Sequence, residues 1–384
     1  MIYFDNAATS WPKPPIVIEA MSRFLGEVGA SPGRSAHRQA VVASRIIYET
    51  REAIAQLFNA PDPLRIVFTL NVTEALNLAL QGLLRPGDHL ILSSMEHNAM
   101  MRPARALERE GVEITTVACS AAGMCDPADI ESAIRKNTAM IALTHASNVT
   151  GTLLPIADVG RIARQHGLIL LVDAAQTAGA YPIDVQADCI DLLAFTGHKS
   201  LYGPTGTGGL VIGGRVDISR LSPLKRGGTG SRSEREEQPD FSPDKFESGT
   251  LNAVGLAGLG ASVRWIMERG VEAIREHEIA LTQKLIAGLM ETPNVTVYGP
   301  LDAQKQTATV SFNLAGLQPS EVGERLDQDC GILCRVGLHC APAAHRTVGT
   351  FPGGTVRFGL GLFNSAEEVR AALAAVNKLT GRAQ

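Results

Sequence analysis

The sequence lacks an excess of positive charge. Its 35 lysine and arginine residues are outnumbered by 39 aspartate and glutamate residues, and the formal net charge is −4. A chain without a broad basic field is poorly suited to bind nucleic acid or an anionic membrane surface. We therefore expect neither of them as a partner.

Long apolar runs are also absent. No segment reaches the roughly 18 uninterrupted apolar residues that a membrane span requires. Residues 1–9 contain neither the basic stretch nor the apolar core of a secretory signal. We expect a cytoplasmic protein. With hydrophobic residues at 45% of the chain, we also expect a globular enzyme with a substantial core.

Closely paired cysteines are a third absence. The six cysteines lie at positions 119, 125, 189, 330, 334 and 340. None of them forms the Cys-x-x-Cys pair that is typical of zinc sites and thioredoxin-like redox sites. We expect no metal site and no disulfide, and we interpret Cys119, Cys189 and Cys330 as small buried hydrophobes.

The pattern of apolar segments predicts an α/β fold. Helical spacing covers residues 14–25 and 35–58. Strand-like runs then alternate with helical stretches, at 66–69, 89–92, 114–117, 140–143, 168–172 and 206–213. Such alternation is typical of a mainly parallel, doubly wound sheet.

The remainder of the chain predicts a smaller C-terminal α+β domain. Two predicted helices cover 251–269 and 271–291. Four strand-like segments follow, at 294–298, 307–314, 330–336 and 354–359, and a last helix begins at Ala366. We expect a large domain over 15–260 and a small domain over 261–384 that includes 1–14. The glycine-rich polar segment 227–238 is a candidate mobile loop, either at the mouth of the active site or as a surface linker.

Two predicted strands end on residues that suit an aldehyde cofactor. The run over 168–172 ends on Asp173, and the run over 190–195 leads to His198 and Lys199. Since ligands of such sheets gather at the carboxyl ends of the strands, the acid and the lysine can address opposite ends of one heteroaromatic ring. Pyridoxal phosphate meets this description, because a lysine forms its Schiff base and an aspartate pairs with its pyridinium nitrogen.

Neighbouring residues suggest a phosphate site. Asn71 and Thr73 lie between a strand and a helix, where the first N–H groups of the helix and the Thr73 hydroxyl can hold an anion. A threonine near a helix start is often an N-cap instead, and this alternative stays open. Thr196 and His198 supply further donors that converge on the same anion.

Three more polar residues follow predicted strands. His97 can stack on a flat ring and handle protons, although a lone histidine is more often a surface or core residue. Gln176 can donate to the phenolic oxygen of the cofactor, and Asn148 can contact a substrate or ring oxygen. Both can equally be turn residues.

These residues together resemble a known family, the class V (fold type I) pyridoxal-phosphate enzymes, and within it the cysteine desulfurases. The resemblance covers nearly the whole chain, in the segments 3–9, 71–75, 95–97, 147–151, 172–176, 196–199, 246–250 and 335–341 and at Arg357.

The resemblance implies a role for each matched residue. Lys199 would be the Schiff-base lysine, Asp173 the partner of the pyridine nitrogen and His97 the stacking group. The implied phosphate ligands are Thr73, Thr196 and His198. Thr250 would reach the phosphate of the other subunit, which implies a homodimer.

The segment that ends in Cys340 points to the reaction. It is similar to the active-site segment of type II desulfurases, in which a thiolate attacks the sulfur of the substrate. The implied reaction converts L-cysteine to L-alanine and leaves a persulfide on Cys340 for an acceptor protein. Arg357 would bind the substrate carboxylate with its planar fork. His339 has no assigned role, since adjacency in a strand would place it on the face opposite Cys340.

One departure and several alternatives remain. Leu338 stands where the family commonly has a second histidine. This favours a less characterised desulfurase-like branch over the main iron–sulfur assembly enzyme. A selenocysteine lyase or a cysteine sulfinate desulfinase would use the same cofactor site. A class V aminotransferase and a catalytically idle scaffold are further alternatives, and Cys340 can also be a buried structural thiol.

Overall fold

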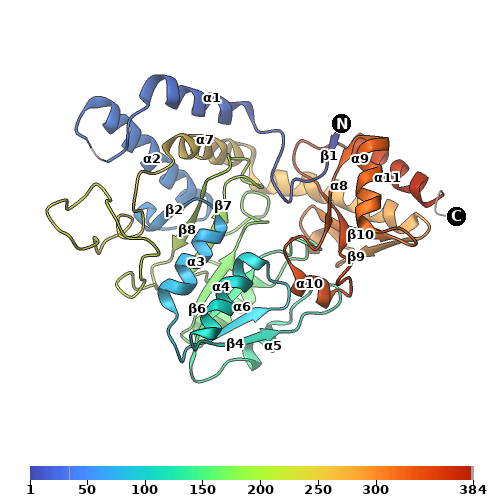
Figure 1. The fold of residues 1–384 in the computed structure, drawn as a ribbon, viewed down its shortest axis with the longest axis horizontal. Coiled ribbons are helices and arrows are strands. Elements are labelled where there is room, and N and C mark those ends of the chain that lie inside the picture. Colours follow the sequence, from blue (N-terminus) through green and yellow to red (C-terminus); the bar gives the residue numbers. More distant parts are fainter. Residues whose placement is uncertain (34, 382–384) are drawn as a thin grey trace.

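The computed structural model describes residues 1–33 and 35–381. The larger part of the molecule is built on a seven-stranded sheet (Figure 1). Its strands are β2 (Ile66–Thr69), β3 (His89–Ser93), β4 (Glu113–Val117), β5 (Thr138–Thr144), β6 (Ile169–Asp173), β7 (Leu192–Thr196) and β8 (Gly208–Ile212). Their order is β2-β8-β7-β6-β5-β3-β4, and β8 runs antiparallel to both of its neighbours while the other pairs are parallel. The predicted α/β fold with a mainly parallel sheet is confirmed.

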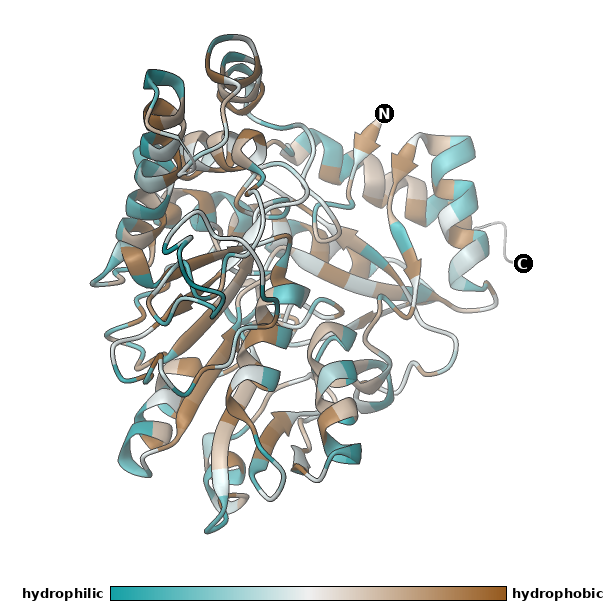
Figure 2. Ribbon diagram, turned by 60° about the vertical axis from the view of Figure 1, so that its left-hand side comes forward, coloured by the Kyte–Doolittle hydropathy of each residue, from teal (hydrophilic) through white to brown (hydrophobic). Residues whose placement is uncertain are grey.

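Helices cover both faces of this sheet. One face packs against α2 (Arg38–Leu57), α5 (Pro127–Ser132), α6 (Ile156–Gln165) and α7 (Ala253–Arg269), and the other against α3 (Val72–Leu83) and α4 (Asn98–Arg109). Successive strand residues point to opposite faces, so Leu170 and Val172 join the first core and Leu171 the second. Burial on both sides explains why the strands read as continuous apolar runs (Figure 2).

The remaining N-terminal helix lies outside this layer. Helix α1 (Pro15–Arg23) continues into a π-helical turn over Phe24–Val28 and packs on α7. It confirms the helix predicted at 14–25. Among residues 1–33 and 35–381, no helix combines the length and the apolar character that crossing a bilayer requires.

The C-terminal part forms a second, smaller layer. Its antiparallel sheet has the order β12-β13-β10-β9, with β9 (Val295–Tyr298), β10 (Thr309–Leu314), β12 (Arg335–Gly337) and β13 (Thr355–Gly359). Helices α8 (Val271–Glu291), α9 (Pro319–Cys330) and α11 (Ala366–Thr380) share its core. Strand β1 (Ile2–Tyr3) pairs with β11 (Ile332–Leu333), so the N-terminus lies with the C-terminal elements (Figure 1). The domain bounds at 14/15 and 260/261 stay a prediction.

The small sheet turns a polar face toward the large one. In β13, Val356 and Phe358 enter the core, whereas Thr355 and Arg357 alternate with them and face the other way. Ser311 of β10 lies on this polar face and donates to the carbonyl of Val149, just beyond β5, at 2.6 Å. The polar face therefore covers the carboxyl ends of the parallel strands.

Two segments differ from the predicted elements. The strand predicted at 330–336 is divided into β11 and β12, because α9 extends to Cys330 and Cys334 separates the two strands. A short helix, α10 (Pro342–Thr347), was not predicted and follows Cys340 closely. Residues 227–238 form turns and irregular backbone, and their mobility and role stay predictions.

A buried ion pair ties α2 to the edge of the large sheet. The Arg51 guanidinium pairs with the carboxylate of Glu247 and also donates to the carbonyl of Ile66 in β2. The other carboxylate oxygen of Glu247 accepts from the Phe68 N–H at 2.6 Å. Arg51 also lies over the Phe68 ring, with its Cζ atom 4.4 Å from the ring centroid. Each charge therefore has several partners.

Removing the negative member of this pair will destabilise the fold. Glu247→Gln leaves the Arg51 guanidinium buried without a counter-charge, so we expect the free energy of unfolding to fall by about 3–5 kcal/mol. Urea denaturation followed by circular dichroism measures this change. The control is Glu49→Gln, which breaks the exposed Arg45–Glu49 pair and should cost less than about 0.5 kcal/mol. Equal losses in the two variants would contradict the prediction.

Candidate active site

The predicted acid and lysine lie together at the strand ends. Asp173 closes β6, and Lys199 follows the neighbouring strand β7 by three residues. The chain turns between them at Gly197, where a Cβ atom would lie 2.1 Å from the Thr207 hydroxyl oxygen. A side chain at this position would collide with Thr207 and crowd Leu259, so only glycine fits two residues before Lys199.

Burial tunes the charges of this pair. It raises the pKa of Asp173, although the Ala175 N–H at 2.9 Å and the charge of Lys199 act in the opposite direction. Burial also lowers the pKa of Lys199 to about 8 against the attraction of Asp173, and the nearby cations Arg357 and Arg335 lower it further. The neutral, nucleophilic amine of Lys199 is therefore well populated just above neutral pH.

The N-terminal segment holds the backbone of the lysine in place. The carbonyl of His198 accepts from the Ser10 N–H at 2.9 Å, the Thr9 hydroxyl at 3.1 Å and the Lys13 ammonium at 3.0 Å. The carbonyl of Lys199 accepts from the Ser10 hydroxyl at 2.7 Å. These hydrogen bonds were not predicted from the sequence, because no local pattern connects residues 9–13 with the loop that contains Lys199.

Lys13 adds a cation that lacks a carboxylate partner in the described part of the chain. Burial lowers its pKa to about 8. Burial also lowers the pKa of His198 to about 4, with smaller effects from Lys199 and Lys13. His198 is therefore neutral, and its buried Nδ1 atom has no hydrogen-bond partner among residues 1–33 and 35–381. Such an unmatched buried group is suited to a polar ligand.

The other candidate phosphate ligands, Thr73 and Thr196, differ in exposure. Asn71, rather than Thr73, caps α3, because its side chain accepts from the Glu74 N–H at 3.0 Å. The N-cap alternative for Thr73 is therefore wrong, and its exposed hydroxyl lies in the first turn of the helix. Thr196 is buried, and its hydroxyl donates to the carbonyl of Thr207 at 3.4 Å.

Thr250 is exposed on the surface near the same helix start. It lines a hollow together with Thr69, Leu70 and Glu74 at the carboxyl end of β2. None of the hydrogen bonds among the described residues joins it to Lys199, and its role toward another subunit stays a prediction.

His97 is the N-cap residue of α4. Its Nδ1 atom accepts from the Ala99 N–H at 3.0 Å. Burial, followed by the charges of Lys199 and Arg335, lowers the pKa of His97 to about 3. The ring is therefore neutral, and its proton lies on Nε2. His97 can donate from Nε2, but a second proton on Nδ1 would break the cap.

Gln176 and Asn148 are both buried and partly engaged. The Gln176 amide donates to the carbonyl of Ala7 at 3.0 Å, and the Asn148 amide donates to the carbonyl of His339 at 2.7 Å. The Asn148 side-chain oxygen is buried without a partner in the described residues. It remains available to a substrate.

Arg357 joins three parts of the chain. Its guanidinium donates to the carbonyl of Asn148 at 2.9 Å and pairs with Asp5 at 3.0 Å. Its Nε atom is buried and has no partner among residues 1–33 and 35–381. Arg335 lies directly opposite it, since β12 and β13 pair these two residues. The two guanidinium groups form a positively charged patch beside Lys199.

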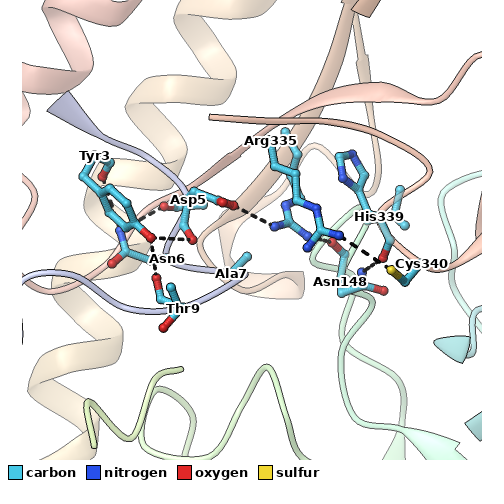
Figure 3. Close-up of polar contacts among 12 residues, drawn as sticks. Tyr3, Asp5, Asn6, Ala7, Thr9, Asn148, Arg335, His339 and Cys340 are labelled. Atoms are coloured by element: carbon cyan, nitrogen blue, oxygen red, sulfur yellow. Dashed lines mark hydrogen bonds and ion pairs between the residues drawn. The ribbon is translucent and has the colours of Figure 1, made fainter. Parts of the chain in front are cut away.

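Cys340 lies on a turn at the edge of this positively charged patch. It is exposed, and its sulfur accepts from the Arg335 guanidinium at 3.6 Å (Figure 3). His339 and Cys340 both adopt left-handed backbone conformations, with φ of 46° and 58°. The backbone N–H of Asn98 donates to the carbonyl of Cys340 at 2.8 Å. Cys340 is therefore not a buried structural thiol.

The turn also corrects the interpretation of His339. The two residues do not alternate across a strand, because β12 ends at Gly337. The His339 ring is buried and bonds to the Thr355 hydroxyl at 3.0 Å. Burial, with smaller contributions from Arg357 and His345, lowers its pKa to about 2. His339 is thus a neutral anchor of the turn. Figure 3 shows it turned toward the small sheet while Cys340 points away.

The interpretation of three further cysteines as small buried hydrophobes is confirmed only in part. Cys189 is buried as expected, whereas Cys119 and Cys330 are only partly buried.

Known proteins share this sequence and this architecture. The aminotransferase class-V family matches residues 2–372. A probable cysteine desulfurase of Methanothermobacter thermautotrophicus is 37% identical over 96% of this chain and 92% of its own length. A probable cysteine desulfurase of Pyrococcus abyssi is 35% identical over 99% of this chain and 94% of its own length.

Solved structures give the same result. The apo structure of a cysteine desulfurase from Thermococcus onnurineus superposes with a TM-score of 0.93 at 34% identity, covering 99% of this chain and 95% of that one. The cysteine desulfurase CsdA from Escherichia coli gives a TM-score of 0.87 at 30% identity, covering 99% and 94%. The chain therefore belongs to the class-V aminotransferase family and, within it, to the cysteine desulfurases.

Proposed function

We propose that the protein is a pyridoxal-phosphate-dependent cysteine desulfurase in which Cys340 accepts the sulfur of L-cysteine. The observation that carries this proposal is the exposed thiol on a strained turn, in contact with Arg335 and close enough to Lys199 for their charges to interact. L-cysteine and the Cys340 thiol would give L-alanine and a Cys340 persulfide, and no atom is left over.

The residues around Lys199 fit pyridoxal phosphate. Asp173 is a buried acid suited to a pyridinium nitrogen, and Lys199 offers a neutral amine to the aldehyde. His198 brings a buried nitrogen without a partner, next to the hydroxyl of Thr196 and the cation of Lys13. When bound, the cofactor withdraws electrons from the substrate and weakens its Cα–H and C–S bonds.

The chain's own side chains would position and activate the reactants. Arg357 offers unused N–H groups to the substrate carboxylate, in place of or beside Asp5. Lys199, once free, can accept and return the Cα proton, because its pKa of about 8 lies near neutral pH. Arg335 donates to the Cys340 sulfur at 3.6 Å and holds it at the edge of the site. His97 can donate a proton only from Nε2.

The decisive experiment measures L-alanine and sulfide released from L-cysteine in the presence of a reductant. Cys340→Ala should reduce turnover to background and leave the visible absorbance of the cofactor unchanged. The matched control is Cys334→Ala, because burial raises the pKa of Cys334 to about 12 and keeps that thiol protonated. Cys334→Ala should turn over like the wild type.

Undiminished turnover by Cys340→Ala would exclude this cysteine as the sulfur acceptor. The same assay with selenocysteine and with cysteine sulfinate would then show whether the site serves a lyase that needs no thiol.

Cofactor capture should depend on pH through Lys199. Its pKa is lowered from 10.5 to about 8, so the reactive neutral amine is lost as the pH falls through that value. We expect the rate at which the apoprotein captures pyridoxal phosphate to rise up to about pH 8 and then level off, measured by absorbance. A free lysine derivative, with an amine pKa of about 10.4, is the control. A rate that still rises to about pH 10 would contradict the assignment.

We infer that two copies of the chain form the working enzyme. Apolar side chains are exposed along α1 and α2 and the turn between them, at Ile16, Ile18, Leu25, Val41 and Tyr48. A partner that covers this face would remove the apolar surface from water. A homodimer would also give exposed Thr250 a neighbouring subunit to contact.

Sedimentation will test the dimer. The wild type should sediment with the mass of two chains, and Ile18→Glu with that of one. The control is Met290→Glu, at an exposed apolar residue of α8 in the smaller part of the molecule, which should leave the dimer intact. A wild type that sediments as a single chain would rule out the proposal.

An acceptor protein would take the sulfur from Cys340. The exposure of this residue is the observation that supports such a partner.

A further inference from the structure

Cys119 and Cys125 face each other across a tight turn after β4. The Ser120 N–H donates to the carbonyl of Met124 at 2.9 Å, and the Met124 N–H donates back to the Ser120 hydroxyl at 3.1 Å. A further bond, from the Gly123 N–H to the Ser120 carbonyl at 2.7 Å, closes the turn. Cys119 directly precedes Ser120, and Cys125 directly follows Met124. Because Ser120 and Met124 are paired across the turn, the two cysteines lie opposite each other.

This placement suits a disulfide. Residues opposite each other next to a bonded pair in antiparallel chains have Cα atoms about 4.5 Å apart, within the range of about 4.4–6.8 Å that disulfides require. The two side chains are neighbours, since each thiol shifts the pKa of the other. Joining the two sulfurs therefore requires little movement of the backbone.

The two thiols differ in a way that assigns their roles. Cys119 is partly accessible, and the neighbouring Cys125 thiol lowers the pKa of Cys119, with help from Ser94 and against the effect of burial. Cys125 is buried, and the neighbouring Cys119 thiol together with burial raises the pKa of Cys125. An accessible thiolate beside a buried thiol is the arrangement of an attacking and a resolving cysteine.

We propose that Cys119 and Cys125 form a reversible redox site that closes to an intramolecular disulfide, with a low-molecular-weight disulfide as the oxidant. The Cys119 thiolate attacks one sulfur of the oxidant and releases its other half as a thiolate. The Cys125 sulfur then attacks Cys119, loses its proton and releases the second half. The oxidant is reduced by two electrons to two thiols, and the protein loses two hydrogens.

The position of the pair connects it with the active site. The Cys119 N–H donates to the Ser94 hydroxyl at 3.0 Å, and the same oxygen accepts from the Thr347 hydroxyl at 2.9 Å. Thr347 ends α10, the helix that follows the turn of Cys340. The charge of Cys119 also contributes to the raised pKa of Glu96, although burial of Glu96 is the main cause. Oxidation would remove that charge.

The test uses the full-length protein and oxidised glutathione. After free thiols are alkylated, peptide mass spectrometry should find Cys119 joined to Cys125, with two hydrogens lost. Dithiothreitol should restore both thiols. The proposal does not depend on desulfurase activity, and the wild-type measurement needs no substitution.

Two variants test the assigned roles. Cys125→Ser should retain a stable glutathione adduct on Cys119, because the resolving thiol is gone. Cys119→Ser should form neither the link nor an adduct on Cys125. The proposal is overturned if wild-type Cys119 stays reduced, holds glutathione while Cys125 remains free, or pairs with Cys340 instead.

Discussion

The buried guanidinium of Arg357 connects the three parts of the chain that build the site. It projects from β13 of the small sheet, donates to the carbonyl of Asn148 beyond β5 and pairs with Asp5 of the N-terminal segment. A buried charge is tolerated only when it is paired and hydrogen-bonded. These contacts therefore fix the small sheet over the strand ends, and the position of Cys340 relative to Lys199 depends on them.

The second guanidinium gives this site its electrostatic character. Like charges directly opposite each other destabilise a pair of strands, yet Arg335 and Arg357 lie opposite each other in register. Asp5 on one side and the Cys340 sulfur on the other offset the repulsion in part. The remaining positive potential has two consequences: it favours a substrate with a carboxylate, and it helps to keep Lys199 neutral.

The parts of the site that could be predicted from the sequence are those with a local cause. A buried strand that ends on Asp173, and another that leads to Lys199, place both residues at one edge of a parallel sheet. The contacts of Ser10 and Lys13 with that loop could not be predicted, because they depend on long-range packing. The same holds for the opposition of Cys119 and Cys125, since five residues between two cysteines do not reveal a turn that brings them together.

The left-handed turn at Cys340 was also beyond prediction, and its energetics explain how the thiol is held. Two consecutive non-glycine residues in this conformation cost about 1–2 kcal/mol each. The N–H of Asn98 and the amide of Asn148 bond to the two carbonyls of the turn, and the buried His339 ring bonds to Thr355. These bonds offset the strain and anchor the His339 side chain. The neighbouring Cys340 side chain must therefore point outward. A thiol held in this way meets Arg335 on one side and solvent on the other, which suits the role proposed for Cys340 of receiving sulfur inside the site and passing it out.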